Sequence, residues 1–150
     1  MLGLVLLSMV VSSQAFPSFT SGLEAACSSC DGIPEHDSVV PQQSYNPLDV
    51  LYEIDEDGSF IHIKISSDRP FRGFMIKPSS AGFFGLGENT TLLHCDDGLD
   101  ALTHKNAIDK VSITTMFIRT ANEPRWISFR ITLVEKFDVF WPPSTLDIYL

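Results

Sequence analysis

Three cysteines and four histidines are the side chains of this 150-residue chain that could bind a metal or perform redox chemistry. Cys27 and Cys30 form a CxxC pair, but the residues around them are Ser, Asp, Gly and Pro, which favour a loop. A redox-active CxxC needs a strand-to-helix context that activates the thiol, and a structural zinc site usually has two close ligand pairs. We therefore expect a structural disulfide from Cys27 or Cys30 to Cys95, which would close a loop of about 65 residues and stabilise the fold by roughly 4 kcal/mol.

Two acidic segments contain oxygen ligands of the kind that calcium prefers. They are Glu53-x-Asp55-x-Asp57-Gly58 and the group of Asp96, Asp97 and Asp100. The first segment is not an EF-hand, because placing Gly58 at the sixth loop position puts Lys64 at the twelfth, where a bidentate Glu is required. Weak calcium binding at either segment is an alternative to a simple solvated turn.

Catalytic signatures are absent from the sequence. It contains no GxSxG, HExxH, P-loop or GxGxxG motif, and the glycine-rich stretch 82–87 has the wrong order for a dinucleotide fingerprint and indicates a flexible loop. Alternation places His62 on the polar face of a strand, whereas His36 and His104 fall in expected loops, where we expect them to bond backbone. We therefore predict no catalytic residue, no cofactor and no metal site, and a protein that is not an enzyme.

The charge balance excludes two classes of function. The chain has 10 Lys and Arg against 19 Asp and Glu, a formal net charge of -9. Nucleic-acid binding needs a basic face that neutralises phosphates, and membrane lysis by an amphipathic helix needs positive charge. The hydrophobic content of 44% and the 11 Phe argue for a folded core and against disorder.

The first 15 residues have the features of a secretory signal peptide. The apolar run 2–11 is followed by small residues at Ser13 and Ala15, and it is too short to span a bilayer, which takes about 20 apolar residues. A buried N-terminal strand or helix is the alternative. We expect residues 16–150 to form one secreted domain without membrane insertion, and the sequon that begins at Asn89 to carry a glycan.

Short β-favouring segments separated by turn residues dominate the remainder of the chain. Ile61, Ile63 and Ile65 alternate with polar residues, as in a strand with one buried face. The expected strands are 49–54, 59–66, 71–77, 90–95, 111–120, 126–141 and 146–150, with loops at 68–70, 78–87 and 96–106 and an irregular entry segment at 16–47. No amphipathic helix is expected. This spacing indicates an antiparallel β-sandwich.

An ordered series of motifs gives the chain a family resemblance. The motifs are Cys30-Asp31-Gly32-Ile33-Pro34-Glu35-His36, Pro41-Gln42, Phe71-Arg72-Gly73-Phe74-Met75, Leu93-His94-Cys95, Thr103-His104, Lys110 before a β run, Phe129-Arg130-Ile131 and Val139-Phe140-Trp141. Over about residues 22–141 the series resembles the Reeler domain, the module at the N-terminus of reelin. It is most similar to the small stand-alone members called insect-type defence proteins.

The resemblance implies an immunoglobulin-like sandwich with a disulfide that pins the N-terminal segment. It places this disulfide between Cys95 and the cysteine before Pro-x-His, which is Cys30, with Cys27 as the alternative. Two elements depart from the family pattern: Met116-Phe117 stands where the family has Trp, and the glycine-then-Phe element is Gly82-Phe83-Phe84.

The resemblance also implies a function. Stand-alone Reeler proteins are associated with innate immunity and antimicrobial defence, so we expect a secreted protein that binds an extracellular or microbial-surface ligand. The expected binding groups lie around His36, Phe83, Phe84 and His104. Haem and reductase activity belong to other domains of larger relatives and are not expected. The alternative function is an acidic extracellular-matrix or biomineral-associated protein with weak calcium binding.

Overall fold

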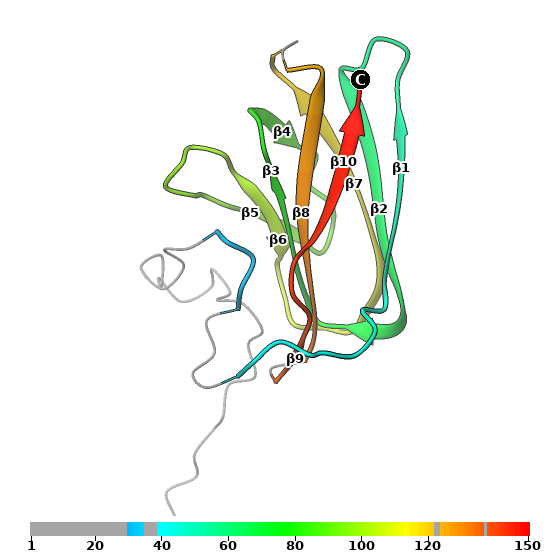
Figure 1. Cartoon of the computed structure of the whole chain (residues 1–150), viewed down its shortest axis with the longest axis vertical. Helices are drawn as coiled ribbons and strands as arrows, with labels where there is room; N and C mark the ends of the chain where they lie inside the picture. The colour runs from blue at the N-terminus through cyan, green and yellow to red at the C-terminus, as the bar shows by residue number, and fades with distance from the viewer. Residues whose placement is uncertain (1–29, 35–38, 122–123, 137) are drawn as a thin grey trace, which may run out of the picture.

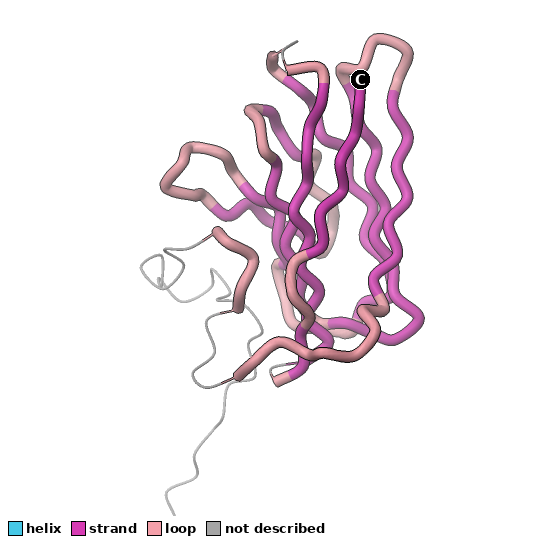
Figure 2. The backbone as a smooth tube through the Cα atoms, viewed as in Figure 1, coloured by secondary structure: helices cyan, strands magenta, loops and turns pink. Residues whose placement is uncertain are grey.

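The computed structural model describes residues 30–34, 39–121, 124–136 and 138–150, which form ten strands in two antiparallel sheets (Figure 1 and Figure 2). No helix occurs among these residues. The two sheets face each other across a hydrophobic core. The prediction of an all-β, immunoglobulin-like antiparallel sandwich is therefore confirmed. The predicted signal peptide, residues 1–15, lies outside the described residues.

Each sheet is a ladder of antiparallel neighbours. The four-stranded sheet has the order β1 (Leu48–Ile54), β2 (Phe60–Phe71), β7 (Lys110–Arg119) and β4 (Gly82–Phe84). The six-stranded sheet has the order β10 (Ser144–Tyr149), β8 (Trp126–Lys136), β3 (Gly73–Pro78), β6 (Ala101–His104) and β5 (Thr90–Leu93), and β9 (Val139–Phe140) pairs with β8.

The core follows from the period-two alternation of apolar side chains. Ile61, Ile63 and Ile65 of β2 are at most 1% exposed, and the polar residues between them face solvent. The rings of Phe117 and Phe129 meet edge to face at 5.2 Å between centroids, which joins β7 of one sheet to β8 of the other. Burial of these side chains holds the two sheets together.

The outer side of the six-stranded sheet carries a second buried cluster, covered by the N-terminal segment. Met75, Val134 and Phe140 are buried there, with Cys30 and Val39 packed against them. The hydroxyl of Thr132, which is fully buried, donates to the carbonyl oxygen of Gly32 at 2.6 Å. The sheet is therefore buried on both faces at β8, and the described residues 30–34 and 39 of the entry segment pack against the domain.

Two segments that the sequence assigns to loops are strands. Residues 82–84 form β4, which pairs with the edge of β7, and residues 101–104 form β6, which lies between β3 and β5 with all four residues buried. A short strand buried on both faces has no alternation to detect. The predicted loops at 78–87 and 96–106 are wrong in these parts.

Two predicted strand boundaries are also wrong. Strand β2 continues through residues 68–70 to Phe71, because a register shift after Ser66 accommodates Pro70 at an exposed position. The single strand predicted for 126–141 ends at Lys136, and β9 then folds back to pair with β8. Regular alternation up to residue 141 concealed this turn.

Candidate functional site

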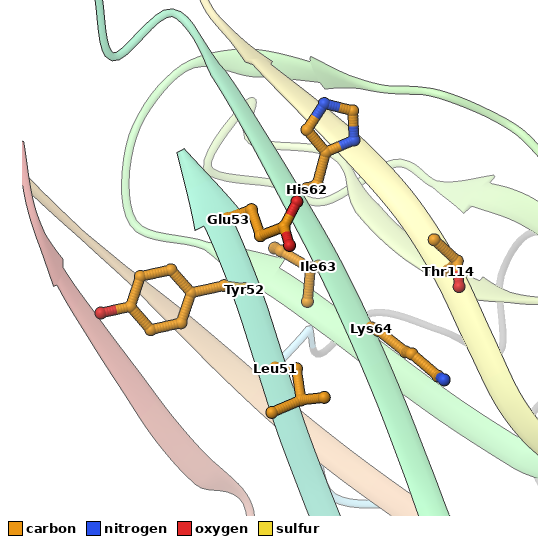
Figure 3. A pocket seen from close by; sticks show the side chains of 7 residues that line it. All are labelled: Leu51, Tyr52, Glu53, His62, Ile63, Lys64 and Thr114. Carbon is orange, nitrogen blue, oxygen red and sulfur yellow. The ribbon is translucent and has the colours of Figure 1, made fainter. Parts of the chain in front are cut away.

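The outer face of the four-stranded sheet contains a pocket between β1, β2 and β7. The strand register places Leu51 beside Lys64 and Lys64 beside Thr114, with Glu53 beside His62 one row away. The pocket has a volume of about 330 Å³ and is lined by Leu51, Tyr52, Glu53, His62, Ile63, Lys64 and Thr114 (Figure 3). Alternation turns the side chains of His62 and Lys64 toward this face, whereas those of Ile61, Ile63 and Ile65 take the inward positions.

The chemistry of the pocket is mixed. A carboxylate from Glu53, an imidazole from His62 and an ammonium from Lys64 share the site with Leu51, which is 58% exposed. Such a surface can bind a ligand that has both an apolar part and charged groups. The described residues contain no group of three or more His, Cys, Asp or Glu side chains placed to hold a metal ion.

A row of apolar side chains lies on the same sheet, with exposed Phe60 and Phe83 at its ends and half-buried Ile118 between them. Phe60 of β2 is beside Ile118 of β7, which is beside Phe83 of β4. Phe83 is 66% exposed and also lines a second pocket of about 210 Å³, formed with residues 78, 80–82, 98–100 and 120. Large exposed apolar side chains in register on a sheet face are typical of a recognition surface.

The structure separates the residues that we expected to bind a ligand. Phe83 is on the surface, but Phe84 is only 8% exposed and its ring packs on Phe117 at 4.9 Å between centroids. His104 is 2% exposed within β6, so its predicted place in a loop is wrong. The Phe74 N–H donates to His104 Nδ1 at 3.4 Å, so His104 contacts strand backbone in β3 and not the loop backbone that we expected. His36 lies outside the described residues.

The first acidic segment forms the hairpin turn between β1 and β2. Asp55 Oδ1 accepts a hydrogen bond from the Phe60 N–H, and Asp57 Oδ1 accepts one from the Ser59 N–H, both at 2.8 Å. Hydrogen bonds from the side chain and backbone of Ser59 lower the pKa of Asp57. Gly58 has a φ of 74°, a conformation that favours glycine. These carboxylates therefore stabilise a turn.

The second acidic segment is paired with basic side chains. Lys77 Nζ lies 2.7 Å from Asp97 Oδ1, and the Leu99 N–H donates to the same oxygen at 2.9 Å. The Lys77 hydrogen bond is the main cause of a lowered pKa at Asp97. Asp100 Oδ1 lies 2.8 Å from Nδ1 of His94. Asp97 and Asp100 thus stabilise the turn between β5 and β6 through side-chain pairs and a backbone contact, and Asp96 is exposed.

The ammonium group of Lys110 is surrounded by backbone carbonyl groups. Its Nζ donates to the carbonyl oxygens of Arg72 at 3.0 Å, Asn106 at 2.8 Å and Ile108 at 2.8 Å. Burial lowers the pKa of Lys110 to about 8, although the Asp109 carboxylate opposes this shift. The position that the motif series singles out therefore joins loop backbone rather than facing a ligand.

The sequence predicted two covalent features, a disulfide and a glycan at Asn89, and the structure contains the disulfide. Cys30 and Cys95 form a disulfide across 65 residues, with 5.8 Å between their Cα atoms, and Cys27 lies outside the described residues. Asn89 is half-buried in the turn before β5, where its Oδ1 accepts a hydrogen bond from Asn106 Nδ2 at 3.2 Å. Glycosylation of Asn89 stays a prediction.

Sequence reasoning missed most of the pocket on the outer sheet face. It identified His62 as exposed and Glu53 as acidic, but it did not bring either together with Leu51, Lys64 or Thr114. The available signal was the polar alternation of residues 60–66, which marks a solvent-facing row without giving its neighbours.

Comparison with protein families places the whole described domain in one group. The model of the Reeler domain family matches residues 26–148. Ferric-chelate reductase 1 of Mus musculus is 30% identical over 126 residues, and that of Homo sapiens is 28% identical over 120 residues. These matches cover 75% and 73% of this chain but only 21% and 18% of the relatives, so the chain spans about a fifth of their length.

Solved structures with the same fold are similarly diverged in sequence. The Reelin-N domain of F-spondin superposes with a TM-score of 0.58 and 14% identity, covering 74% of this chain and 91% of that one. The human F-spondin reeler domain (fragment 1) gives a TM-score of 0.54 and 14% identity, covering 73% and 94%. At these identities the likeness shows the fold.

Within the part of the chain that the structure describes, no helix is long and apolar enough to cross a membrane.

Proposed function

Because the chain belongs to the Reeler domain family, we propose that it is a secreted, non-enzymatic protein of innate defence that binds a microbial-surface ligand. The observation that carries the proposal is the outer face of the four-stranded sheet. This face joins the pocket of Glu53, His62 and Lys64 to exposed apolar side chains, including Phe83. The combination suits recognition of a ligand with charged and apolar parts.

Three further features support binding over lysis or catalysis. The net charge of -9 disfavours direct attack on anionic membranes, since electrostatic attraction to lipid is missing. Lys110 and His104 contact backbone atoms within the fold, so these buried titratable groups have structural roles. The curated relatives are named ferric-chelate reductases, but this chain matches about a fifth of their length, and we do not extend the reductase activity to it.

The test measures binding of the purified protein to intact bacteria and to isolated cell-wall polymers. We expect the Phe83→Ser and Lys64→Glu variants to lose binding. Tyr149→Ser is the matched control, because Tyr149 is an aromatic residue that is 82% exposed on the other sheet. Equal loss in the control variant would contradict the proposed surface, and no binding by the wild type would contradict the function.

Two more assays address the mechanism. We expect no leakage from anionic vesicles at concentrations where bacteria are bound, and leakage would argue for a lytic protein instead. We also expect no reduction of ferric chelates, and turnover of such a chelate would overturn the non-enzymatic assignment. Induction of the transcript by bacterial challenge separates defence from a constitutive role in a mineralised matrix.

A further inference from the structure

Strand β1 is an exposed edge of the four-stranded sheet. It pairs with β2 through seven consecutive residues without a bulge, and the described residues place no strand on its other side. The opposite edge of this sheet is β4, which has only three residues. Natural edge strands are usually protected by proline, a bulge or charged side chains, and β1 has no proline, lysine or bulge and only acidic charges, at Asp49 and Glu53. It is therefore competent to pair with another strand.

The register shows which backbone groups face outward. The Asp55 N–H donates to the Phe60 carbonyl at 3.1 Å, so the ladder to β2 includes Asp55 and, by antiparallel alternation, Glu53 and Leu51. The N–H and C=O groups of Val50, Tyr52 and Ile54 then point away from β2. Figure 3 shows the Tyr52 ring extending in the same direction, past the side of β1.

Strand β1 and the turn that follows it carry five acidic residues and no basic one. Residues 1–63 contain nine Asp or Glu and no Lys or Arg, whereas residues 64–150 contain ten of each. Five of the nine acidic residues lie within residues 49–57, which are β1 and its turn. Asp49 and Glu53 flank Leu51 on the outer face of the strand. The charge therefore favours a basic partner at β1.

The same charges disfavour a second copy of this chain at the edge. A two-fold pair of β1 strands centred on Leu51 would place Asp49 of each copy opposite Glu53 of the other. Like charges directly opposite each other on neighbouring strands are destabilising. A basic segment in the same position would instead form two opposite-charge pairs.

We propose that β1 binds an extended basic segment of another protein, which adds a strand to the four-stranded sheet. Basic side chains would lie beside Asp49 and Glu53, and an apolar one would lie beside Leu51. Lys64, which neighbours Leu51 in the pocket, disfavours a third basic residue at the central position. This inference rests on the proposed binding function and names a partner chemistry for it.

The test uses synthetic heptapeptides, matched to the length of β1. In the binding peptide, lysines occupy positions 2 and 6, beside Glu53 and Asp49, and valine occupies position 4, beside Leu51. One control has the same composition with the lysines grouped, and the other has glutamate in place of lysine. We expect the alternating basic peptide to bind about tenfold more tightly than either control, and to slow amide hydrogen exchange at Val50, Tyr52 and Ile54.

Protein variants distinguish pairing at β1 from general attraction. Tyr52→Pro removes an outward N–H but leaves the ladder to β2, so it should weaken binding about tenfold. The double variant Asp49→Lys with Glu53→Lys should also weaken binding of the basic peptide about tenfold, because it replaces both opposite-charge pairs by like-charge pairs. The matched control is Glu88→Lys with Asp96→Lys, which changes the net charge equally at exposed carboxylates away from β1, and it should retain binding. Thermal unfolding of each variant verifies that it is folded.

Several outcomes would overturn the inference. These are equal losses in the two charge-reversed variants, peptide-induced protection at β10 instead of β1, equal binding of the grouped-lysine peptide, or dimerisation of the wild type through β1. This experiment contains no microbial ligand. A negative result would therefore contradict the inference about β1 without contradicting the proposed binding to bacteria, which is tested separately.

Discussion

Lys110 Nζ lies 3.0 Å from the carbonyl oxygen of Arg72, although the two residues are separated by 38 positions in the sequence. The same ammonium donates to the carbonyl oxygens of Asn106 and Ile108. It therefore joins the loop before β7 to the turn between β2 and β3. One side chain satisfies three backbone acceptors that strand pairing leaves over at this end of the sandwich.

Replacement of Lys110 should destabilise the fold. Lys110→Met keeps the aliphatic stem but leaves the three carbonyl oxygens without this donor, so we expect the free energy of unfolding to fall by about 3 kcal/mol. Urea denaturation measures the change. Lys105→Met, at an exposed lysine in the same loop, is the control and should change the stability by less than about 0.5 kcal/mol. Similar losses in both variants would contradict the role of Lys110.

The ion pair between Lys77 and Asp97 should make the stability of the fold depend on pH in the acidic range. The pKa of Asp97 is lowered from 3.8, mainly by the hydrogen bond from Lys77. Because the folded-state pKa is below the ordinary value, the stability from ionised Asp97 is present above pH 3.8 and is lost as the pH falls through the lowered pKa.

A carboxyl ¹³C NMR titration of Asp97 measures this effect. Lys77→Met should raise its midpoint toward 3.8, and Lys105→Met should leave the midpoint low. The Leu99 N–H still donates to Asp97 in the first variant, so part of the lowering should persist. An unchanged midpoint in Lys77→Met would show that Lys77 is not the cause.

Gly82 should tolerate no side chain. A Cβ there would lie 2.5 Å from the carbonyl oxygen of Ile118 and would overlap the buried Phe117 ring. We expect Gly82→Ala to reduce the free energy of unfolding by about 1–3 kcal/mol. Gly85→Ala is the matched control, since its nearest contact would be 3.6 Å from the Met116 carbonyl oxygen. Calorimetric unfolding compares the two, and equal stabilities would refute this packing argument.

The sequon at Asn89 should carry a glycan when the protein is produced in a eukaryotic secretory host. Treatment with peptide N-glycosidase should then lower the mass of the wild type. Thr91→Ala removes the acceptor motif but keeps the Asn89 side chain and its hydrogen bond to Asn106, so this variant should show no mass change. An identical mass for the treated and untreated wild type would contradict the prediction.

Most of the fold could be predicted from alternation and turn residues. The core positions Ile61, Ile63 and Ile65 are read directly from the period of two, and the disulfide partner Cys95 follows from the family resemblance. Strand β6 could not be predicted, because Thr103 and His104 are polar residues buried by pairing on both sides. Their burial depends on backbone contacts to Phe74, which lies about 30 residues earlier.

The sequence by itself determined the all-β class, the acidic charge and the family, because these depend on local periodicity, composition and motif order. Only the tertiary structure decided which residues share a surface. In the folded chain Phe84 and His104 are buried, whereas Leu51, His62 and Thr114, from three different strands, line one pocket. The physical reason is strand register: a shift of one residue exchanges the two faces of a strand, and long-range pairing sets that register.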